Sequence, residues 1–374
     1  MSKAKKILII ISVMLMITFV AVLVYYLFFK KPPTAVTPSE PGFIDIETGI
    51  SEQERQRLIA VTEESILGAA VDSENGKVVY LALDGSINKI NSDGMEKTRI
   101  GIISPDGVGE VSVSKGGKNV LARLTSQSGI VKYIVYNTQK NSLKSLPERT
   151  ISASLDPAGE NVAVAVSKNF SSTKISAINL ESGKETSLTS TKIPDLVLDW
   201  HSPETIALKT RPSGLAFGIL YDLNIKTKKT TRLLGNKNGL TSLFSPSSKK
   251  VLFSETSEDG NNQSIGAVDT AKGTRQGIGV FTLPEKCAWF SDDRTLICAA
   301  INVKNPDSYL MPDDYYKGRI KFSSEDILKI NLDTGQTQKL INGVFSGYNL
   351  FLSQDESYLF FINKIDGRLY RLTL

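Results

Sequence analysis

The single histidine of this 374-residue chain limits the chemistry that its side chains can perform. Metal sites built on several histidines are excluded, and a Ser-His-Asp triad would have to use His201. His201 follows a short apolar run, at a position where two similar runs carry Phe244 and Phe290. This equivalence favours a packing role over catalysis. The sequence contains no Gly-rich phosphate loop, zinc-protease motif or calcium-loop motif, so no catalytic, cofactor-binding or metal-ligating residue is assigned.

An acidic and aromatic segment, Asp313-Asp314-Tyr315-Tyr316, is the most conspicuous candidate for a surface site. Paired carboxylates can bind a cation or exchange protons. A structural loop and a protein contact are the other interpretations, and all three stay open. Tyr309 and Met311 lie just upstream and add the aromatic and Met content typical of interface cores. The candidate interaction loop therefore comprises Tyr309, Met311, Asp313, Asp314, Tyr315 and Tyr316.

The two cysteines, Cys287 and Cys298, are predicted to face each other across a hairpin. If Asp292 and Asp293 form its two-residue turn, each pair of facing residues has numbers that add up to 585, as 287 and 298 do. Outside the cytoplasm such a pair can form a disulfide, although bridges directly across a hairpin are often strained. The alternative is a pair of buried free thiols.

A long apolar segment near the amino end is a candidate membrane anchor, which would fix the location of the rest of the chain. The run from Ile7 to Phe29 carries no charge, and about 20 apolar residues are enough for a helix to cross a bilayer. Bulky aromatics end the run, whereas a cleaved signal peptide has a shorter apolar region and small residues at its end. We predict a cytoplasmic tail (residues 1–6), a transmembrane helix in contact with membrane lipid (7–29), a Pro-rich stalk (30–55) and an extracytoplasmic domain (56–374).

The formal net charge of +5 belongs to this amino-terminal region. Residues 1–31 hold five of the 44 Lys and Arg residues and no acid, which leaves 39 basic against 39 acidic residues in the remainder. A formally neutral domain without a basic run has little with which to neutralise phosphates. The sequence therefore predicts no nucleic-acid partner.

The region from residue 56 onward repeats a pattern of short β-strands. A weak apolar strand, a polar turn and a stronger apolar strand recur in seven copies, with the stronger strands starting at Val78, Val120, Val162, Ile206, Val251, Leu296 and Leu359. A second hairpin follows the first six copies, with its turns starting at Asn91, Asn137, Asn179, Asn224, Asp269 and Asn331. These starts lie 46, 42, 45, 45 and 62 residues apart. Four strands in a repeat of about 40–50 residues are typical of a β-propeller blade.

The seventh copy ends one strand short. The segment Gln56-Arg57-Leu58-Ile59, which precedes the first copy, is similar to the fourth strands of other copies, such as Gln338-Lys339-Leu340-Ile341. We predict that it pairs beside Arg368–Leu374 and closes an all-β, seven-bladed propeller, which would leave no exposed sheet edge there.

The one long spacing results from an insertion, Asn302 to Ser324, between the second and third strands of blade six. In a propeller, the second-to-third and fourth-to-first connections share one face, and the stalk would enter at the opposite face. We therefore predict that the insertion faces away from the membrane and contributes to a partner-binding surface. The alternative is that its side chains fold back onto blade six as a lid.

The segment from Leu243 to Phe253 resembles the repeat of TolB-type propellers, whose blades open with a serine-proline-aspartate-glycine-lysine turn. The segments Lys286–Ala300 and Met311–Gly318 are also similar to uncharacterised membrane-anchored propellers of bacteria. The resemblance implies the fold and no particular activity.

We therefore expect a single-pass protein of the cell membrane, with its amino terminus in the cytoplasm. Its propeller would be an interaction or scaffold module of the cell envelope whose partner is an envelope or surface protein. The alternative is an extracytoplasmic hydrolase or lyase with a site in the central depression. Converging carboxylates in a deep axial pocket would favour the enzyme, and a flat apolar face would favour the module.

Overall fold

A computed structural model describes residue 16 and residues 51–72, 76–169, 172–301, 309–320 and 324–374. The chain divides into two compact units, Met1–Ile44 and Asp45–Leu374, and the second contains all the described strands. Within the described residues, no helix is long and apolar enough to cross a membrane. The predicted transmembrane helix lies outside these residues, except for Met16, and so does the predicted stalk up to residue 50.

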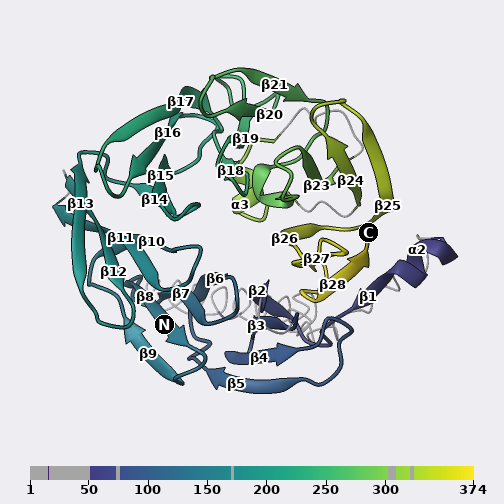
Figure 1. The fold of residues 1–374 in the computed structure, drawn as a ribbon, viewed down its shortest axis with the longest axis horizontal. Coiled ribbons are helices and arrows are strands. Elements are labelled where there is room, and N and C mark those ends of the chain that lie inside the picture. Colours follow the sequence, from purple (N-terminus) through teal and green to yellow (C-terminus); the bar gives the residue numbers. More distant parts are fainter. Residues whose placement is uncertain (1–15, 17–50, 73–75, 170–171, 302–308, 321–323) are drawn as a thin grey trace, which may run out of the picture. The chain divides into compact units, whose positions relative to one another are not determined.

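Seven four-stranded antiparallel sheets surround a common axis, and each sheet is one blade of a β-propeller (Figure 1). In the first six blades the strands follow chain order from the axis outward. Blade one contains β2 (Ile66–Val71), β3 (Val78–Ala82), β4 (Ser86–Ile90) and β5 (Thr98–Ile102), and blade two contains β6 (Val108–Val113), β7 (Asn119–Thr125), β8 (Val131–Asn137) and β9 (Ser142–Ser145). Blade three contains β10 (Thr150–Leu155), β11 (Asn161–Asn169), β12 (Ser172–Asn179) and β13 (Glu185–Thr191).

The remaining blades continue the same pattern. Blade four contains β14 (Leu196–Asp199), β15 (Thr205–Thr210), β16 (Phe217–Asn224) and β17 (Thr230–Asn238). Blade five contains β18 (Ser242–Phe244), β19 (Lys250–Glu255), β20 (Ser264–Asp269) and β21 (Arg275–Ile278). Blade six contains β22 (Cys287–Trp289), β23 (Thr295–Ala300), β24 (Glu325–Asn331) and β25 (Thr337–Phe345), and blade seven contains β26 (Gly347–Leu352), β27 (Tyr358–Asn363), β28 (Leu369–Thr373) and the early strand β1 (Leu58–Ala60). The seven-bladed, all-β fold predicted from the repeat is confirmed.

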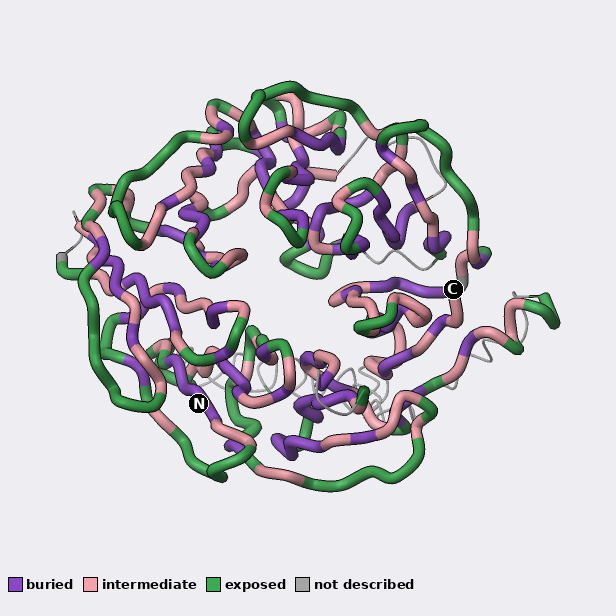
Figure 2. The backbone as a smooth tube through the Cα atoms, viewed as in Figure 1, coloured by how far each residue is buried: buried purple, intermediate pink, exposed green. Residues whose placement is uncertain are grey.

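The central part of each second strand is an uninterrupted apolar run, because another blade covers each of its faces. In β3, Val78 and Tyr80 pack against blade seven, while Val79 and Leu81 pack against blade two. Seven such hydrophobic clusters occur in the described residues, one between each pair of neighbouring blades around the ring. Figure 2 shows the resulting pattern, in which burial is concentrated in the inner strands and exposure in the outermost ones. Since one blade cannot bury both faces alone, the stack of blades is the unit of stability.

The ring closes between the two ends of the propeller. Strand β1 pairs antiparallel with β28, with Leu58 opposite Leu372 and Ala60 opposite Tyr370, so the predicted closing strand is confirmed. Its start differs from the prediction, because Gln56 and Arg57 end a short helix, α2 (Glu52–Arg57). A capping box between Ser51 and Glu54 begins this helix. Residues 52–55, which the sequence analysis assigned to the stalk, thus belong to α2.

The turns between third and fourth strands follow the chemistry expected from their Asn and Asp residues. In five blades the side chain that starts the turn accepts hydrogen bonds from backbone N–H groups two or three residues later, as at Asn137, Asn179, Asn224, Asp269 and Asn331. Such side chains stabilise a turn locally. The spacing of these turns, 42 to 46 residues except for the 62 residues across the insertion, therefore reflects the blade repeat.

Antiparallel pairing places the connections alternately on two faces of the ring. We call the face with the second-to-third and blade-to-blade connections the insertion face, because the connection between β23 and β24, of which residues 309–320 are described, lies there. The opposite face, with the first-to-second and third-to-fourth turns, is the turn face. Strand β1, as a fourth strand, starts at the turn face. The insertion and the start of the closing strand thus lie on opposite faces, as the topology predicted; residues 302–308 and 321–323 lie outside the described part.

Candidate functional site

The innermost strands line an axial channel with a cavity at each face. The insertion-face cavity has a volume of about 620 Å³, and its lining includes Glu110, Lys209, Arg211, Glu285, Asp313 and Tyr316. The turn-face cavity has a volume of about 640 Å³, and its lining includes Asp199, Trp200, Phe244, Trp289, Leu350 and Phe351. Both volumes fall in the range of small-molecule pockets, roughly 300–1,000 Å³. The channel is therefore the part of the described molecule best shaped to receive a ligand or a partner side chain.

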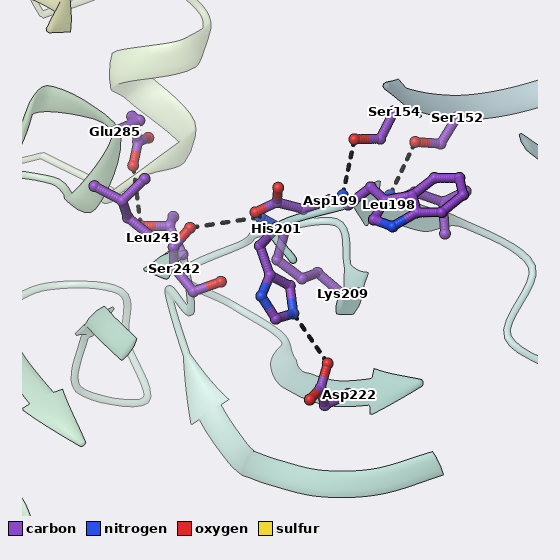
Figure 3. A network of polar contacts seen from close by, with 12 residues as sticks. Ser152, Ser154, Leu198, Asp199, His201, Lys209, Asp222, Ser242, Leu243 and Glu285 are labelled. Carbon is purple, nitrogen blue, oxygen red and sulfur yellow. Dashed lines mark hydrogen bonds and ion pairs between the residues drawn. The ribbon is translucent and has the colours of Figure 1, made fainter. Parts of the chain in front are cut away.

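An ion pair lies where the two cavities adjoin. Lys209 lines the insertion-face cavity, and Asp199 lines the turn-face cavity. The Lys209 Nζ is 3.1 Å from Asp199 Oδ2 and 3.4 Å from the carbonyl oxygen of Ser242, to which it also donates (Figure 3). Burial alone would raise the pKa of Asp199, but attraction to Lys209 and His201 outweighs burial and holds this pKa below its usual range. The middle of the channel is thus ionic.

Glu285 belongs to the short 3₁₀ helix η3 (Pro284–Lys286), which leads into blade six. Its carboxylate accepts hydrogen bonds from Thr241 Oγ1, at 3.1 Å, and from the hydroxyl of Tyr316. Burial, reinforced by the neighbouring Glu285 carboxylate, raises the pKa of Tyr316 well above its usual range. The Tyr316 side chain is therefore a fixed, neutral donor at the cavity wall, although the residue as a whole is half exposed.

The insertion reaches the cavity because it docks on the loops of blades four and five. Asp313 starts helix α3 (Asp313–Tyr316) and accepts hydrogen bonds from the backbone N–H of Gly214, at 2.7 Å, and from the hydroxyl of Ser213, at 3.3 Å. The backbone N–H of Met311 donates to the carbonyl of Gly260, at 3.0 Å. A Cβ atom on Gly214 would come within 2.5 Å of the Met311 carbonyl oxygen. The insertion therefore fits this surface only because the loop residue beneath it lacks a side chain.

The six residues of the predicted interaction loop have different environments. Met311 and Tyr315 are 2% and 5% exposed and pack with Leu283 and Ile320, and Tyr309 packs against the same cluster. These three residues do not form an exposed interface core; their position matches the alternative in which the insertion folds back onto the propeller as a lid. The carboxylate of Asp314 pairs with Arg319, at 3.1 Å. Asp313 and Tyr316 are the two that line the cavity.

A buried ion pair beneath the insertion was not anticipated from the sequence. Lys286 and Glu325 are 1% and 0% exposed, with Nζ and Oε1 2.8 Å apart, and Lys286 also donates to the Gly347 carbonyl at 2.7 Å. Burial lowers the pKa of Lys286 and raises that of Glu325, and the attraction between the two charges opposes both shifts. The partners are 39 residues apart in the chain. No local pattern marks either one, so the sequence offered no signal for the pair.

His201 has the packing role that its equivalence to phenylalanine predicted. Its ring stacks on Phe244 with centroids 3.5 Å apart, and its side chain is 5% exposed. Nε2 lies 3.0 Å from Asp222 of blade four (Figure 3). Nδ1 lies 2.8 Å from the hydroxyl of Ser248, in blade five. His201 thus links two neighbouring blades through stacking and hydrogen bonds.

Cys287 and Cys298 are direct partners in the β22–β23 pair, which confirms the predicted register. Their sulfur atoms are 2.09 Å apart, as a disulfide. The bridge joins the first two strands of blade six, directly after η3. Oxidation of this pair in the native protein remains a prediction.

The feature expected of an enzyme, converging carboxylates in a deep axial pocket, is present only in part. Three carboxylates, Glu110, Glu285 and Asp313, line one axial cavity, but Glu285 and Asp313 are already held by hydrogen bonds within the fold. Among the described residues, no group of three or more His, Cys, Asp or Glu side chains is placed to hold a metal ion. The cavity can bind a ligand, and it shows no assembled catalytic group.

Comparison with known proteins identifies the fold and no family. No protein-family model and no curated protein matches the sequence. An oligogalacturonate lyase in complex with manganese aligns over 85% of this chain and 93% of its own, with 9% identity and a TM-score of 0.61. The tricorn protease aligns over 85% of this chain with 14% identity and a TM-score of 0.52. This chain spans about a third, 34%, of the tricorn protease chain.

The structural neighbours also include TolB from Acinetobacter baumannii, at 13% identity over 79% of this chain and 67% of that chain. The TM-score of 0.46 is too low for this likeness to carry an argument. At 9% and 14% identity, the likenesses to the lyase and to the tricorn protease show the β-propeller fold alone and leave the ligand undefined.

Proposed function

We propose that this chain is a membrane-anchored, extracytoplasmic propeller that binds a protein partner of the cell envelope through its insertion face. One observation carries the proposal. Eight large apolar side chains in the described part of the propeller are exposed, and six of them lie at the insertion face: Leu83, Ile102, Ile130, Leu215, Phe217 and Tyr316. The other two, Met95 and Leu143, lie toward the turn face.

The distribution of these side chains supports a protein contact. Exposed apolar side chains mark interaction sites where they form a patch, and their concentration on one face favours a contact on that face. Leu215, 64% exposed, belongs to the loop on which Asp313 of the insertion docks, and Phe217, 61% exposed, begins β16 shortly after it. Tyr316 of the same insertion adds an exposed aromatic ring whose hydroxyl is hydrogen-bonded to Glu285. Exposed apolar side chains on the face that also opens into a polar cavity are compatible with an interface that has a central anchoring pocket.

The orientation of this face follows from the topology and from the predicted anchor. Strand β1 starts at the turn face, so an anchor preceding it would hold the turn face toward the lipid. The insertion face would then point to the envelope space, where a partner can reach it. The hydrophobic run at residues 7–29 supports the anchor.

A crosslinking comparison tests the proposal in intact cells. A photoreactive phenylalanine analogue replaces Phe217 in one full-length variant and Leu143 in the matched control, because both side chains are exposed and lie toward opposite faces. We expect a discrete crosslinked product from position 217 and none from position 143. Substitution Leu215→Asp should remove that product while the level of the protein stays unchanged. Equal crosslinking from both positions, or none from position 217, would refute the insertion face as the binding surface.

A further inference from the structure

The turn-face cavity differs in chemistry from the cavity on the opposite face. Its walls are mostly apolar, with aromatic side chains from four consecutive blades: Trp200 of blade four, Phe244 of blade five, Trp289 of blade six and Phe351 of blade seven. Ala70 and Val71 of blade one add small apolar side chains. A cavity of about 640 Å³ with such walls is suited to an apolar group.

Most polar groups in this wall are already occupied within the fold. Asp199 pairs with Lys209, and both ring nitrogens of His201 are hydrogen-bonded. The carboxylate of Glu356 accepts the backbone N–H of Ser291 at 2.5 Å. The protein already supplies hydrogen-bond or ionic partners for these groups, so their presence does not indicate a polar ligand.

Lys115 is the exception among the charged groups of the lining. It lies in the turn between the first two strands of blade two and is exposed at the cavity. Within the described residues, no hydrogen bond or ion pair holds its amine, in contrast to the paired Asp199 and Glu356. The cavity therefore combines an apolar interior with one available positive charge.

We propose that the turn-face cavity binds a small amphipathic carboxylate, whose apolar body fills the aromatic half while its carboxylate meets Lys115. This site is on the face opposite the proposed partner surface, so either proposal can fail without the other. The apolar walls provide most of the affinity. The exposed ion pair adds up to about fivefold, because such pairs contribute little in water.

The chain carries its own reporter of binding, since its two tryptophans both line this cavity. The full-length protein, in nanodiscs of zwitterionic lipid, is titrated with cyclohexylbutyrate, which is transparent where tryptophan absorbs. The matched neutral probe is cyclohexylbutyramide. We expect a saturable change in tryptophan emission with both probes, and binding of the acid about two- to fivefold tighter. Empty nanodiscs and free tryptophan correct for partitioning and for direct quenching.

Two variants separate the apolar and ionic parts of the site. Ala70→Phe fills the cavity and should abolish the signal of both probes, provided that its thermal melt shows a folded domain. Lys115→Glu lies on the surface, so it should leave the fold intact and reverse the preference from the acid to the amide. The control Lys140→Gln changes an exposed lysine in another turn of blade two and should bind like the wild type. Absence of a saturable signal in the wild type overturns the proposal, as does an acid preference that survives Lys115→Glu.

Discussion

Blade six and blade two have the same strand order but meet the axis differently. In blade six every residue of the two inner strands β22 and β23 is buried. In blade two the innermost strand β6 has no buried residue, and Gly109 and Glu110 are exposed. The difference arises because blade six carries the insertion, the disulfide and the buried ion pair of Lys286, whereas no comparable group among the described residues covers β6. The propeller fold therefore fixes the positions of the strands. Features of single blades, such as an insertion or a buried ion pair, determine which part of the channel is filled.

Removal of the closing strand should have the largest effect, because blade six and blade two both depend on a closed ring. Deletion of residues 56–61 removes Leu58, 9% exposed, and Val61, 2% exposed, together with the β1–β28 pairing. Burial of each such side chain contributes about 1.5–3 kcal/mol, and the lost strand pairing adds to this. We expect loss of most of the domain's stability in thermal unfolding followed by circular dichroism. A deletion variant that melts like the wild type would contradict closure by β1.

The buried ion pair gives the sharpest contrast between the two blades. Glu325→Ala leaves Lys286 charged and buried, which should reduce the free energy of unfolding by about 3–5 kcal/mol. Glu110→Ala in blade two removes an exposed carboxylate and should change it by less than about 0.5 kcal/mol. Urea unfolding measures both variants. The double variant Lys286→Met with Glu325→Leu should recover most of the loss, and equal effects of the two single alanine substitutions would break the comparison.

The disulfide is a second addition that blade two lacks. Mass measurement after alkylation, with and without reductant, should show no labelled cysteine until reduction. Replacement of Cys287 and Cys298 by alanine should then lower the free energy of unfolding by about 2–4 kcal/mol. Labelling of both cysteines without reductant would show two free thiols. The difference between blade six and blade two would then depend on the insertion and the ion pair alone.

Docking of the insertion can be loosened without touching its own residues. Gly214→Ala places a Cβ atom against the Met311 carbonyl and should cost about 1–3 kcal/mol. The control Gly277→Ala adds a methyl group into open space, since nothing lies within 4 Å of it. We expect faster proteolysis within residues 302–324 in the first variant only. Equal cleavage rates in the two variants would mean that the insertion does not depend on this contact.

The smallest effect concerns Lys364, whose Nζ lies 3.6 Å from the centroid of the Tyr315 ring. Burial and repulsion by Lys286 lower the pKa of Lys364 to about 8. In the unfolded chain a lysine keeps its proton up to about pH 10.4, so between pH 8 and that value the unfolded state binds more protons. Stability should therefore rise with pH across this window, with a small amplitude because Lys364 is only partly buried and keeps substantial contact with solvent. Lys364→Met should reduce the increase of the melting temperature between pH 8 and pH 10. An unchanged slope would mean that other groups cause the increase.

Local sequence patterns were enough to predict the ring of blades. The alternation of turn residues and apolar strands is local, and its repeat of about 45 residues predicts the blades one after another. The short carboxyl-terminal copy and the similarity of Leu58-Ile59 to fourth strands predicted the closure. The Cys287–Cys298 register followed from a two-residue turn. All these features depend on residues that are near neighbours in the chain, or on comparison of one repeat with the next.

The filling of the channel depends on contacts that arise only in the folded protein. Lys286 meets Glu325, and His201 meets Ser248, because the ring brings separate strands or blades together. The burial of Met311 depends on glycines in the loops of blades four and five, far away in the sequence. An aromatic residue in a polar insertion has the same sequence signature whether it packs inward or points to solvent. Whether the side chain packs inward depends on the shape of the surface that it meets in the folded protein and on the hydrogen bonds that this surface can form.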